Sequence, residues 1–140
     1  MREELAIKLN NAASELERLN EVLTEFSRRH ALSARVVHDL NLALEEILIN
    51  VISYAYADNG AHEIWVRLRA GPGEVTAEVE DDGRPFDPLT APEPDIRKSI
   101  DERAVGGLGI HLVRRLMDGL EYKRQGEKNL LIMKKKTEEA

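Results

Sequence analysis

The sequence contains no cysteine among its 140 residues. This absence excludes disulfide bonds, thiolate zinc sites and cysteine nucleophiles, and it favours the reducing cytoplasm. Long apolar runs are also absent: no stretch approaches the roughly 20 apolar residues that cross a bilayer, and the N-terminal MREELAIKLNN lacks the apolar core of a signal peptide. We therefore expect a cytoplasmic protein without a membrane partner.

Basic residues are fewer than acidic residues. The chain has 20 Lys and Arg residues against 26 Asp and Glu residues, for a net charge of −6, which argues against binding to the phosphate backbone of nucleic acid. It does not exclude a small anionic ligand, because a local group of backbone N–H donors can hold phosphate on an acidic protein. The length and the ordinary hydrophobic share of 42% predict a single domain over residues 1–140.

The spacing of apolar residues predicts the regular segments. Leu5, Ile7 and Leu9 alternate with polar residues, which is typical of a half-buried strand, whereas the next two apolar stripes recur at helical spacing. This order of elements favours an α+β fold with helices on one face of a mainly antiparallel sheet. The expected elements are this strand, a helix from the N-cap Ser14 to about His30, a helix from Ser33 to about Ala57, strands over 63–70 and 74–81, a helix over 108–117, and strands over 120–124 and 129–135.

Two parts of the chain lack such a pattern. From Gly83 to Gly109 the periodicity is lost, and four of the five prolines lie there. A loop of this length within a compact domain is usually a lid or a binding loop. Near the C-terminus, we interpret Lys134, Lys135 and Lys136 as a solvated strand end that precedes a frayed tail.

Glu46 and Asn50 form the first candidate site. Four residues separate them on the second expected helix, so their side chains lie on one face, roughly 40° apart, at the edge of the apolar stripe. The carboxylate can accept a proton from an attacking hydroxyl, and the amide oxygen suits magnesium, which takes few protein ligands beside phosphates and water. A polar helix edge is the alternative, because Glu-x-x-x-Asn is frequent by chance.

Asp81 and Gly83 form the second candidate site, directly after an expected strand. A carboxylate at a strand end can accept a hydrogen bond from the amino group of adenine, which is a donor. Glycine two residues later would let the backbone approach the base closely. The alternative is a plain turn, since Asp, Gly and Pro are the usual turn formers.

Gly107 and Gly109 form the third candidate site, where the long loop becomes a helix. Glycines at this place expose successive backbone N–H groups, and the N-terminus of a helix favours negative charge, so a phosphate chain fits both features. The alternative is a glycine hinge before a helix. His111, in the first turn after the glycines, is either a helix-surface residue or a phosphate contact.

The three motifs occur in an order that resembles a known family. They are similar to the N, G1 and G2 boxes of the GHKL ATPases, a superfamily that includes DNA gyrase, histidine kinases and MutL. The phrases LALEEILINVISYAY, VEDDGRPFDP and GGLGIHLVRRLMD look most like the anti-sigma factor serine/threonine kinases. The motifs are Glu46-x-x-x-Asn50, Asp81-x-Gly83-x-Pro85-Phe86-Asp87-Pro88 and Gly107-x-Gly109.

This resemblance implies a Bergerat fold, a two-layer α/β sandwich that holds ATP between its helical layer and a flexible lid. It also implies residue roles: Glu46 as general base, Asn50 as magnesium ligand, Asp81 as the contact of the adenine amino group, Gly83 in the base pocket, and Gly107 and Gly109 at the phosphates.

The resemblance further implies a protein serine/threonine kinase that phosphorylates an anti-sigma factor antagonist in a partner-switching circuit. A sigma factor is a second implied partner, and its binding in this family often depends on a homodimer. Two alternatives stay open: a nucleotide-gated protein-binding module without kinase chemistry, and the detached ATP-binding half of a histidine kinase. Two features depart from the family: Tyr54 stands where it often has histidine, and the stretch Gly126-Glu127-Lys128-Asn129 lacks its usual threonine. The amide of Asn129 can still support Asp81 or the base.

Overall fold

The computed structural model describes residues 3–12, 14–54, 62–85, 87 and 107–137. All the expected strands and helices are present, and where both ends are described their bounds shift by no more than two residues. The elements in chain order are β1 (Glu3–Asn10), α1 (Glu15–Arg29), α2 (Ala34–Tyr54), β2 (Glu63–Gly71), β3 (Glu74–Asp81), α3 (Gly107–Leu116), β4 (Gly119–Gln125) and β5 (Lys128–Lys136).

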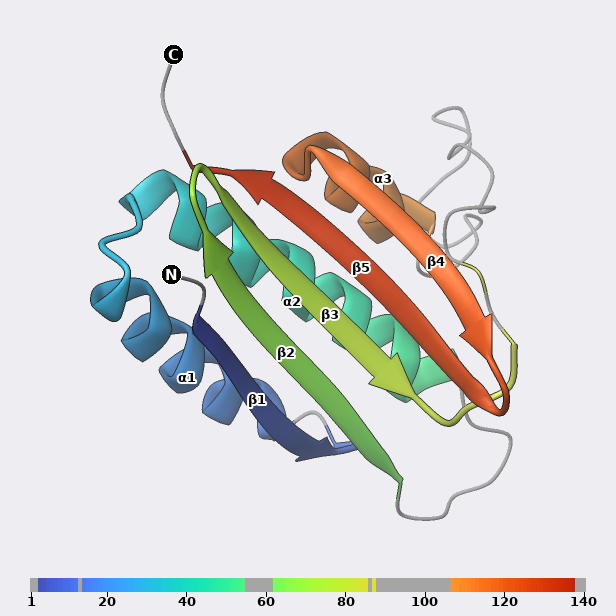
Figure 1. The fold of residues 1–140 in the computed structure, drawn as a ribbon. Helices are drawn as coiled ribbons and strands as arrows, with labels where there is room; N and C mark the ends of the chain where they lie inside the picture. The colour runs from blue at the N-terminus through green and yellow to red at the C-terminus, as the bar shows by residue number, and fades with distance from the viewer. Residues whose placement is uncertain (1–2, 13, 55–61, 86, 88–106, 138–140) are drawn as a thin grey trace.

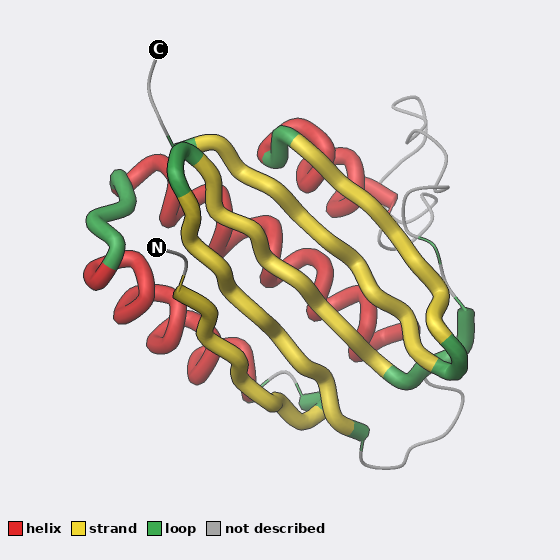
Figure 2. The backbone as a smooth tube through the Cα atoms, in the orientation of Figure 1, coloured by secondary structure: helices red, strands yellow, loops and turns green. Residues whose placement is uncertain are grey.

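The five strands form one antiparallel sheet in the order β1-β2-β3-β5-β4. The helices lie together on one face of this sheet, and α2 runs behind its middle strands (Figure 1). The tube in Figure 2 shows the same two layers, one of helices and one of strands. The expected α+β sandwich is therefore confirmed.

Alternation along each strand explains why one face of the sheet is covered. In β3 every second side chain, from Val75 to Asp81, is buried, while the residues between them are only half-buried. The buried series of β2 pairs directly with it, since Ile64 lies opposite Asp81 and Val66 opposite Val79. Apolar residues of the helices complete the core, among them Leu40, Leu44 and Leu48 of α2. Burial of this apolar surface is the main force that holds the two layers together.

The starts of the two long helices differ. Ser33 accepts a hydrogen bond on its Oγ from Val36 N at 3.2 Å and so caps α2. Ser14 stands before α1 as expected, but its side chain makes no capping hydrogen bond. Its backbone is already helical, with φ −62° and ψ −20°, whereas a capping residue normally has an extended backbone that aims its oxygen at the first turn.

Two hairpin turns are confirmed at the expected glycines. Gly73 and Gly126 have φ values of 71° and 61°, in the left-handed region that glycine enters without a steric penalty. Helix α3 begins at Gly107, within the segment that we expected to be a loop. The expected end of α2 at Ala57 and most of the expected lid lie outside the described residues. None of the described helices is long and apolar enough to cross a membrane.

One prediction about the last strand is wrong. Lys134 and Lys136 are exposed as expected, but Lys135 is buried. Its side chain follows Leu131 and Met133 on the inner face of β5, because alternate residues of a strand share a face. There its Nζ lies 3.0 Å from Asp39 Oδ2 of α2 and donates to Leu116 O of α3 at 2.7 Å.

Candidate nucleotide site

Asn50 lies on the second half of α2, where it is 4% exposed. Its Nδ2 donates to the backbone carbonyl of Glu46 at 2.8 Å. Since that carbonyl can only accept, the amide nitrogen must face it, and the carbonyl oxygen of Asn50 is turned away from the helix backbone. Glu46 is half-buried one turn earlier. The helix thus presents one acceptor oxygen of fixed direction beside a carboxylate.

Asp81 is the last residue of β3 and is 5% exposed. Its Oδ1 accepts two hydrogen bonds, from Gly83 N and from Asn129 Nδ2, each at 2.9 Å. Two donors on one oxygen fix the rotation of the carboxylate. Within the described residues the structure records no hydrogen bond to Oδ2, so this oxygen retains its capacity to accept.

Both the nitrogen and the oxygen of the Asn129 side-chain amide make hydrogen bonds. Its Nδ2 also donates to Arg84 O at 2.8 Å, while its Oδ1 accepts from the hydroxyl of Tyr122 and from Arg124 Nη1. Arg124 Nη1 in addition donates to Gly83 O at 2.8 Å. The expected support of Asp81 by Asn129 is therefore confirmed, and the neighbouring strand β4 fixes both Asn129 and the turn that follows β3.

Burial raises the pKa of the Asp81 carboxyl, because desolvation disfavours its charged form. The hydrogen bonds from Asn129 and Gly83 act in the opposite direction, since they favour the carboxylate. The charge of nearby Asp82 raises the pKa further and that of Arg124 lowers it. The arrangement keeps a desolvated acceptor at the end of the strand, which is where an amino donor would gain most from a hydrogen bond.

Gly107 and Gly109 lie in the first turn of α3. The N–H groups of a first helical turn have no partners within the helix, and the helix dipole places positive potential there. The first turn of α3 holds no acidic residue that would oppose an anion. Helix α2 packs against both α3 and β3, and in Figure 1 the end of β3, the last turns of α2 and the start of α3 lie on the same side of the molecule.

A metal site made of protein side chains alone is not found in the described part of the chain, where no three His, Asp or Glu residues are placed to share an ion. The oxygen of Asn50 is nevertheless a suitable hard ligand, because magnesium bound to a nucleotide takes most of its ligands from phosphates and water. The single oxygen of Asn50 therefore fits a magnesium ion that is already bound to the phosphates of the nucleotide.

A family model described as the histidine kinase-like ATPase domain matches residues 9–135. The chain belongs to this family. The match covers each of the candidate residues, from Glu46 to Gly109, and extends to the strand that carries Asn129.

Relatives of the same family are protein kinases by name. The serine/threonine-protein kinase BtrW of Bordetella bronchiseptica is 32% identical over 111 residues, which cover 79% of this chain and 78% of that protein. The serine-protein kinase RsbW of Listeria monocytogenes is 26% identical over 103 residues, which cover 71% of this chain and 66% of that protein.

The fold is similar to that of a solved structure, the RsbU and RsbW domains of Rv1364c from Mycobacterium tuberculosis. The TM-score is 0.66 at 16% identity, and the similarity covers 96% of this chain and 32% of that one. At this level of identity the likeness supports the fold of the ATPase family.

Tyr122 and Arg124 are the residues of the site that the sequence analysis missed. Both belong to the inner face of β4, and Arg124 pairs directly with Asn129 across the β4–β5 ladder. Alternation with Leu120 is the signal that could have placed them there, since every second residue of a strand faces the same side. Arg124 is exposed at the end of this face, where its guanidinium reaches Asn129 and the backbone of Gly83.

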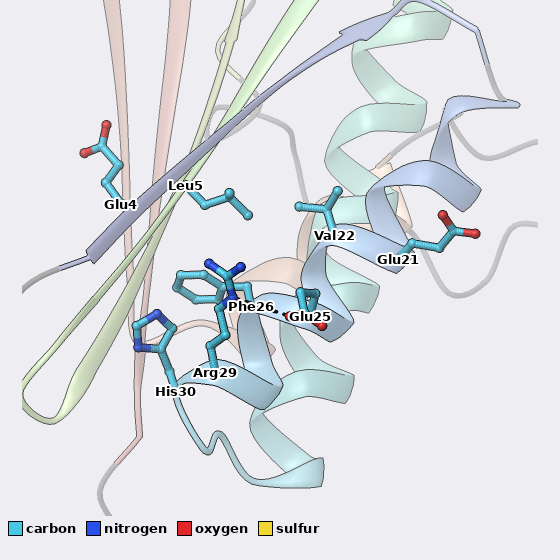
Figure 3. A pocket seen from close by; sticks show the side chains of 8 residues that line it. All are labelled: Glu4, Leu5, Glu21, Val22, Glu25, Phe26, Arg29 and His30. Atoms are coloured by element: carbon cyan, nitrogen blue, oxygen red, sulfur yellow. Dashed lines mark hydrogen bonds and ion pairs between the residues drawn. The ribbon is translucent and has the colours of Figure 1, made fainter.

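A separate pocket lies between α1 and the edge strand β1 (Figure 3). Leu5, Val22 and Phe26 form its apolar part. Two carboxylates at its rim are paired with arginines: Glu25 accepts from Arg28 and Arg29 of its own helix, and Glu4 accepts from Arg69 of β2. This pocket is two strands away from Asp81 in the sheet and shares no lining residue with the candidate site.

Proposed function

We propose that this chain is a cytoplasmic, ATP-dependent protein serine/threonine kinase whose residues 1–140 form a single nucleotide-binding domain. Its acceptor is an anti-sigma factor antagonist, and a sigma factor is a second partner of a homodimer. The observation that carries the proposal is the Asp81 carboxylate, which has one oxygen held by two donors and the other able to accept from adenine. Membership of an ATPase family and relatives named as serine kinases support it.

The nucleotide would lie along the side of the molecule where β3 and α2 end and α3 begins. The amino group of adenine donates to Asp81 Oδ2, and the backbone at Gly83, which is buried beside this carboxylate, lines the base. The phosphates lie at the N–H groups around Gly107 and Gly109, where the helix dipole favours negative charge. Asn50 would hold magnesium through its side-chain oxygen, and the ion would then neutralise charge on the phosphate oxygens.

Glu46 is the group proposed to move a proton. The hydroxyl oxygen of the acceptor serine or threonine attacks the γ-phosphorus while the carboxylate of Glu46 takes the hydroxyl proton. The bond between the γ-phosphorus and the β–γ bridging oxygen breaks, and ADP leaves with that electron pair. Positioning and electrostatic stabilisation do most of the remaining work, as in phosphoryl transfer generally.

A nucleotide-gated protein-binding module without kinase activity is the second candidate function. It uses the same nucleotide site, but Glu46 then only orders water near the magnesium ion. The presence of a carboxylate at Glu46, one helical turn from Asn50, favours the kinase, because a carboxylate can take the hydroxyl proton.

Phosphoryl transfer from labelled ATP to candidate antagonists tests the proposal, with Glu46→Gln beside the parent. The amide keeps the shape of the side chain but cannot take the proton, so we expect transfer to fall by about 10²–10⁴-fold, the usual contribution of a general base, while ATP affinity changes little. Glu45→Gln is the matched control, because Glu45 is also half-buried and adjacent on α2.

Two results would contradict the kinase assignment. Equal transfer by Glu46→Gln and the parent would remove Glu46 from the role of base. A parent that transfers no phosphate to any antagonist, yet binds one with an affinity that differs between ATP and ADP, would establish the gated module instead.

A further inference from the structure

The amide of Asn129 is oriented by contacts on all its polar atoms. Its oxygen accepts from the Tyr122 hydroxyl and from Arg124 Nη1 at 3.2 Å, and its nitrogen donates to Asp81 Oδ1 and Arg84 O. Rotation of the amide by half a turn would place its oxygen against a carboxylate and a carbonyl, which are both acceptors. Tyr122 and Arg124 therefore determine that Asn129 presents a donor to Asp81.

The donor from Asn129 determines in turn how Asp81 is presented. Because Asn129 and Gly83 both donate to Oδ1, any other orientation of the carboxylate plane would lose these hydrogen bonds. The second oxygen, Oδ2, is thereby held in the direction in which it would meet a ligand. A carboxylate oxygen accepts from an amino group but opposes a carbonyl group, because two acceptors that face each other leave both unsatisfied.

We propose that Asn129, held by Tyr122 and Arg124, is a positioning residue that makes the site selective for adenine over bases with a carbonyl at the same ring position. This inference rests on the proposed function, in which Asp81 binds the base. Adenine carries an amino donor at this position, whereas guanine and hypoxanthine carry a carbonyl acceptor. A buried site built for one hydrogen-bonding pattern rejects the opposite pattern strongly.

Loss of the Asn129 donor affects the two kinds of base differently. The carboxylate then rotates more freely, so the hydrogen bond to adenine is weakened. It also loses a hydrogen bond that favours its charged form, while burial and Asp82 still favour the neutral form and Arg124 still opposes it. A neutral carboxyl can donate to a carbonyl of hypoxanthine. The affinity for adenine therefore falls while that for hypoxanthine falls less, so the ratio of the two affinities decreases.

The test compares the dissociation constants of ADP and IDP, whose bases differ in the group at this position, by titration calorimetry with the intact chain. For Asn129→Leu we expect ADP binding to weaken by about tenfold, with a smaller change for IDP, so that the ratio of the two constants falls. Tyr122→Phe removes only the hydroxyl that holds the amide, and it should lower the ratio in the same direction by a smaller factor. Glu121→Gln is the control, since Glu121 is exposed on the same strand.

The outcomes separate this inference from the function on which it rests. If folded Asn129→Leu and Tyr122→Phe keep the parent's ratio of the ADP and IDP dissociation constants, the role of Asn129 is overturned, even if Asp81→Asn weakens ADP binding. If Asn129→Leu does not fold, the ratio in Tyr122→Phe decides the question by itself. A parent that binds neither nucleotide would overturn the inference together with the proposed nucleotide site.

Discussion

Two charged side chains are buried on the inner face of the sheet, and their surroundings differ. Lys135 is paired: a carboxylate of Asp39 and a helix carbonyl receive its hydrogen bonds. Asp81 lies on the paired strand six positions beyond Val75, the partner of Lys135, roughly 20 Å away. It has donors on one oxygen but retains acceptor capacity on the other. The first arrangement joins α2, β5 and α3, whereas the second leaves one oxygen of Asp81 for the proposed ligand.

This difference predicts that mutation of Lys135 changes mainly the stability of the protein, whereas mutation of Asp81 changes mainly its affinity for nucleotide. A closed buried pair contributes to stability because breaking it leaves one charge unpaired. The Asp81 carboxylate has no such partner, and its desolvation opposes folding. We therefore expect it to contribute to ligand binding and not to stability.

Lys135→Met should lower the free energy of unfolding by about 3–5 kcal/mol, because Asp39 would remain buried without its cation. Urea unfolding followed by circular dichroism measures the change. Lys134→Met is the control, since Lys134 is exposed one residue earlier on the same strand. Equal stability of the two variants would show that the pair with Asp39 does not join the layers as described.

Asp81→Asn should act on affinity and not on stability. We expect ATP to bind more weakly by about 1.5–3 kcal/mol, the usual loss for a hydrogen bond to a charged group, while the free energy of unfolding stays level or rises because no charge is buried. Titration calorimetry and urea unfolding measure the two quantities. Asp82→Asn, at an exposed neighbour, is the control. Unchanged ATP affinity in the folded Asp81→Asn protein would remove the adenine contact.

Asn50→Ala should change the response to magnesium. The variant lacks the proposed ligand oxygen, so magnesium should increase its ATP affinity less than that of the parent. We expect the difference to be about tenfold, the usual value of one contact to a charged group. Affinity without magnesium should be nearly unchanged. Titrations with and without the ion, on parent and variant, measure this difference. The same magnesium dependence in both proteins would exclude Asn50 as a ligand.

The smallest effect is a difference in pH dependence between the two carboxyls. Burial would raise the pKa of Asp39, but hydrogen bonds from Lys135 and His38 and the charge of Lys135 outweigh it and lower the pKa. Its stabilising contribution is therefore present above the ordinary Asp pKa and is lost as the pH falls through the lowered value. Asp81, whose pKa is raised, favours the folded state more as the pH falls through that raised value towards the ordinary one.

Urea unfolding between pH 7 and pH 3 measures these opposite slopes. The stability of the parent relative to Asp81→Asn should rise towards acid pH, whereas its stability relative to Asp39→Asn should fall. ATP affinity of the parent should also decrease in acid, because a protonated Asp81 presents a weaker acceptor to adenine. Parallel curves for all three proteins would contradict both assignments.

The fold was predictable from the sequence because alternation and helical spacing are local. Val75 to Asp81 specify a strand with one buried face regardless of what covers it, and Gly73 and Gly126 specify turns. The position of Asp81 at the end of its strand and that of Asn50 at the edge of the apolar stripe of its helix were predictable for the same reason. The roles of the candidate residues stay predictions until the nucleotide experiments are done.

The partners of these residues were not predictable in the same way. Lys135 looks like its exposed neighbours in the sequence. Alternation with Leu131 and Met133 indicates its inward face, but its pairing with Asp39 depends on how α2 packs against the sheet. The contact of Tyr122 with Asn129 depends on the register of β4 against β5, which pattern alone does not fix. The helical backbone of Ser14 likewise depends on how the chain enters α1 and not on the capping preference of serine.

The position of β5 has a consequence for the order in which the site is made during synthesis. This strand comes last in the described sheet, yet it lies between β3 and β4 and supplies Asn129. While the ribosome still holds residues 128–136, β3 and β4 have no common neighbour and Asp81 lacks one of its donors. The proposed base contact is therefore complete only after β5 has paired with β3, since Asn129 reaches Asp81 through that pairing.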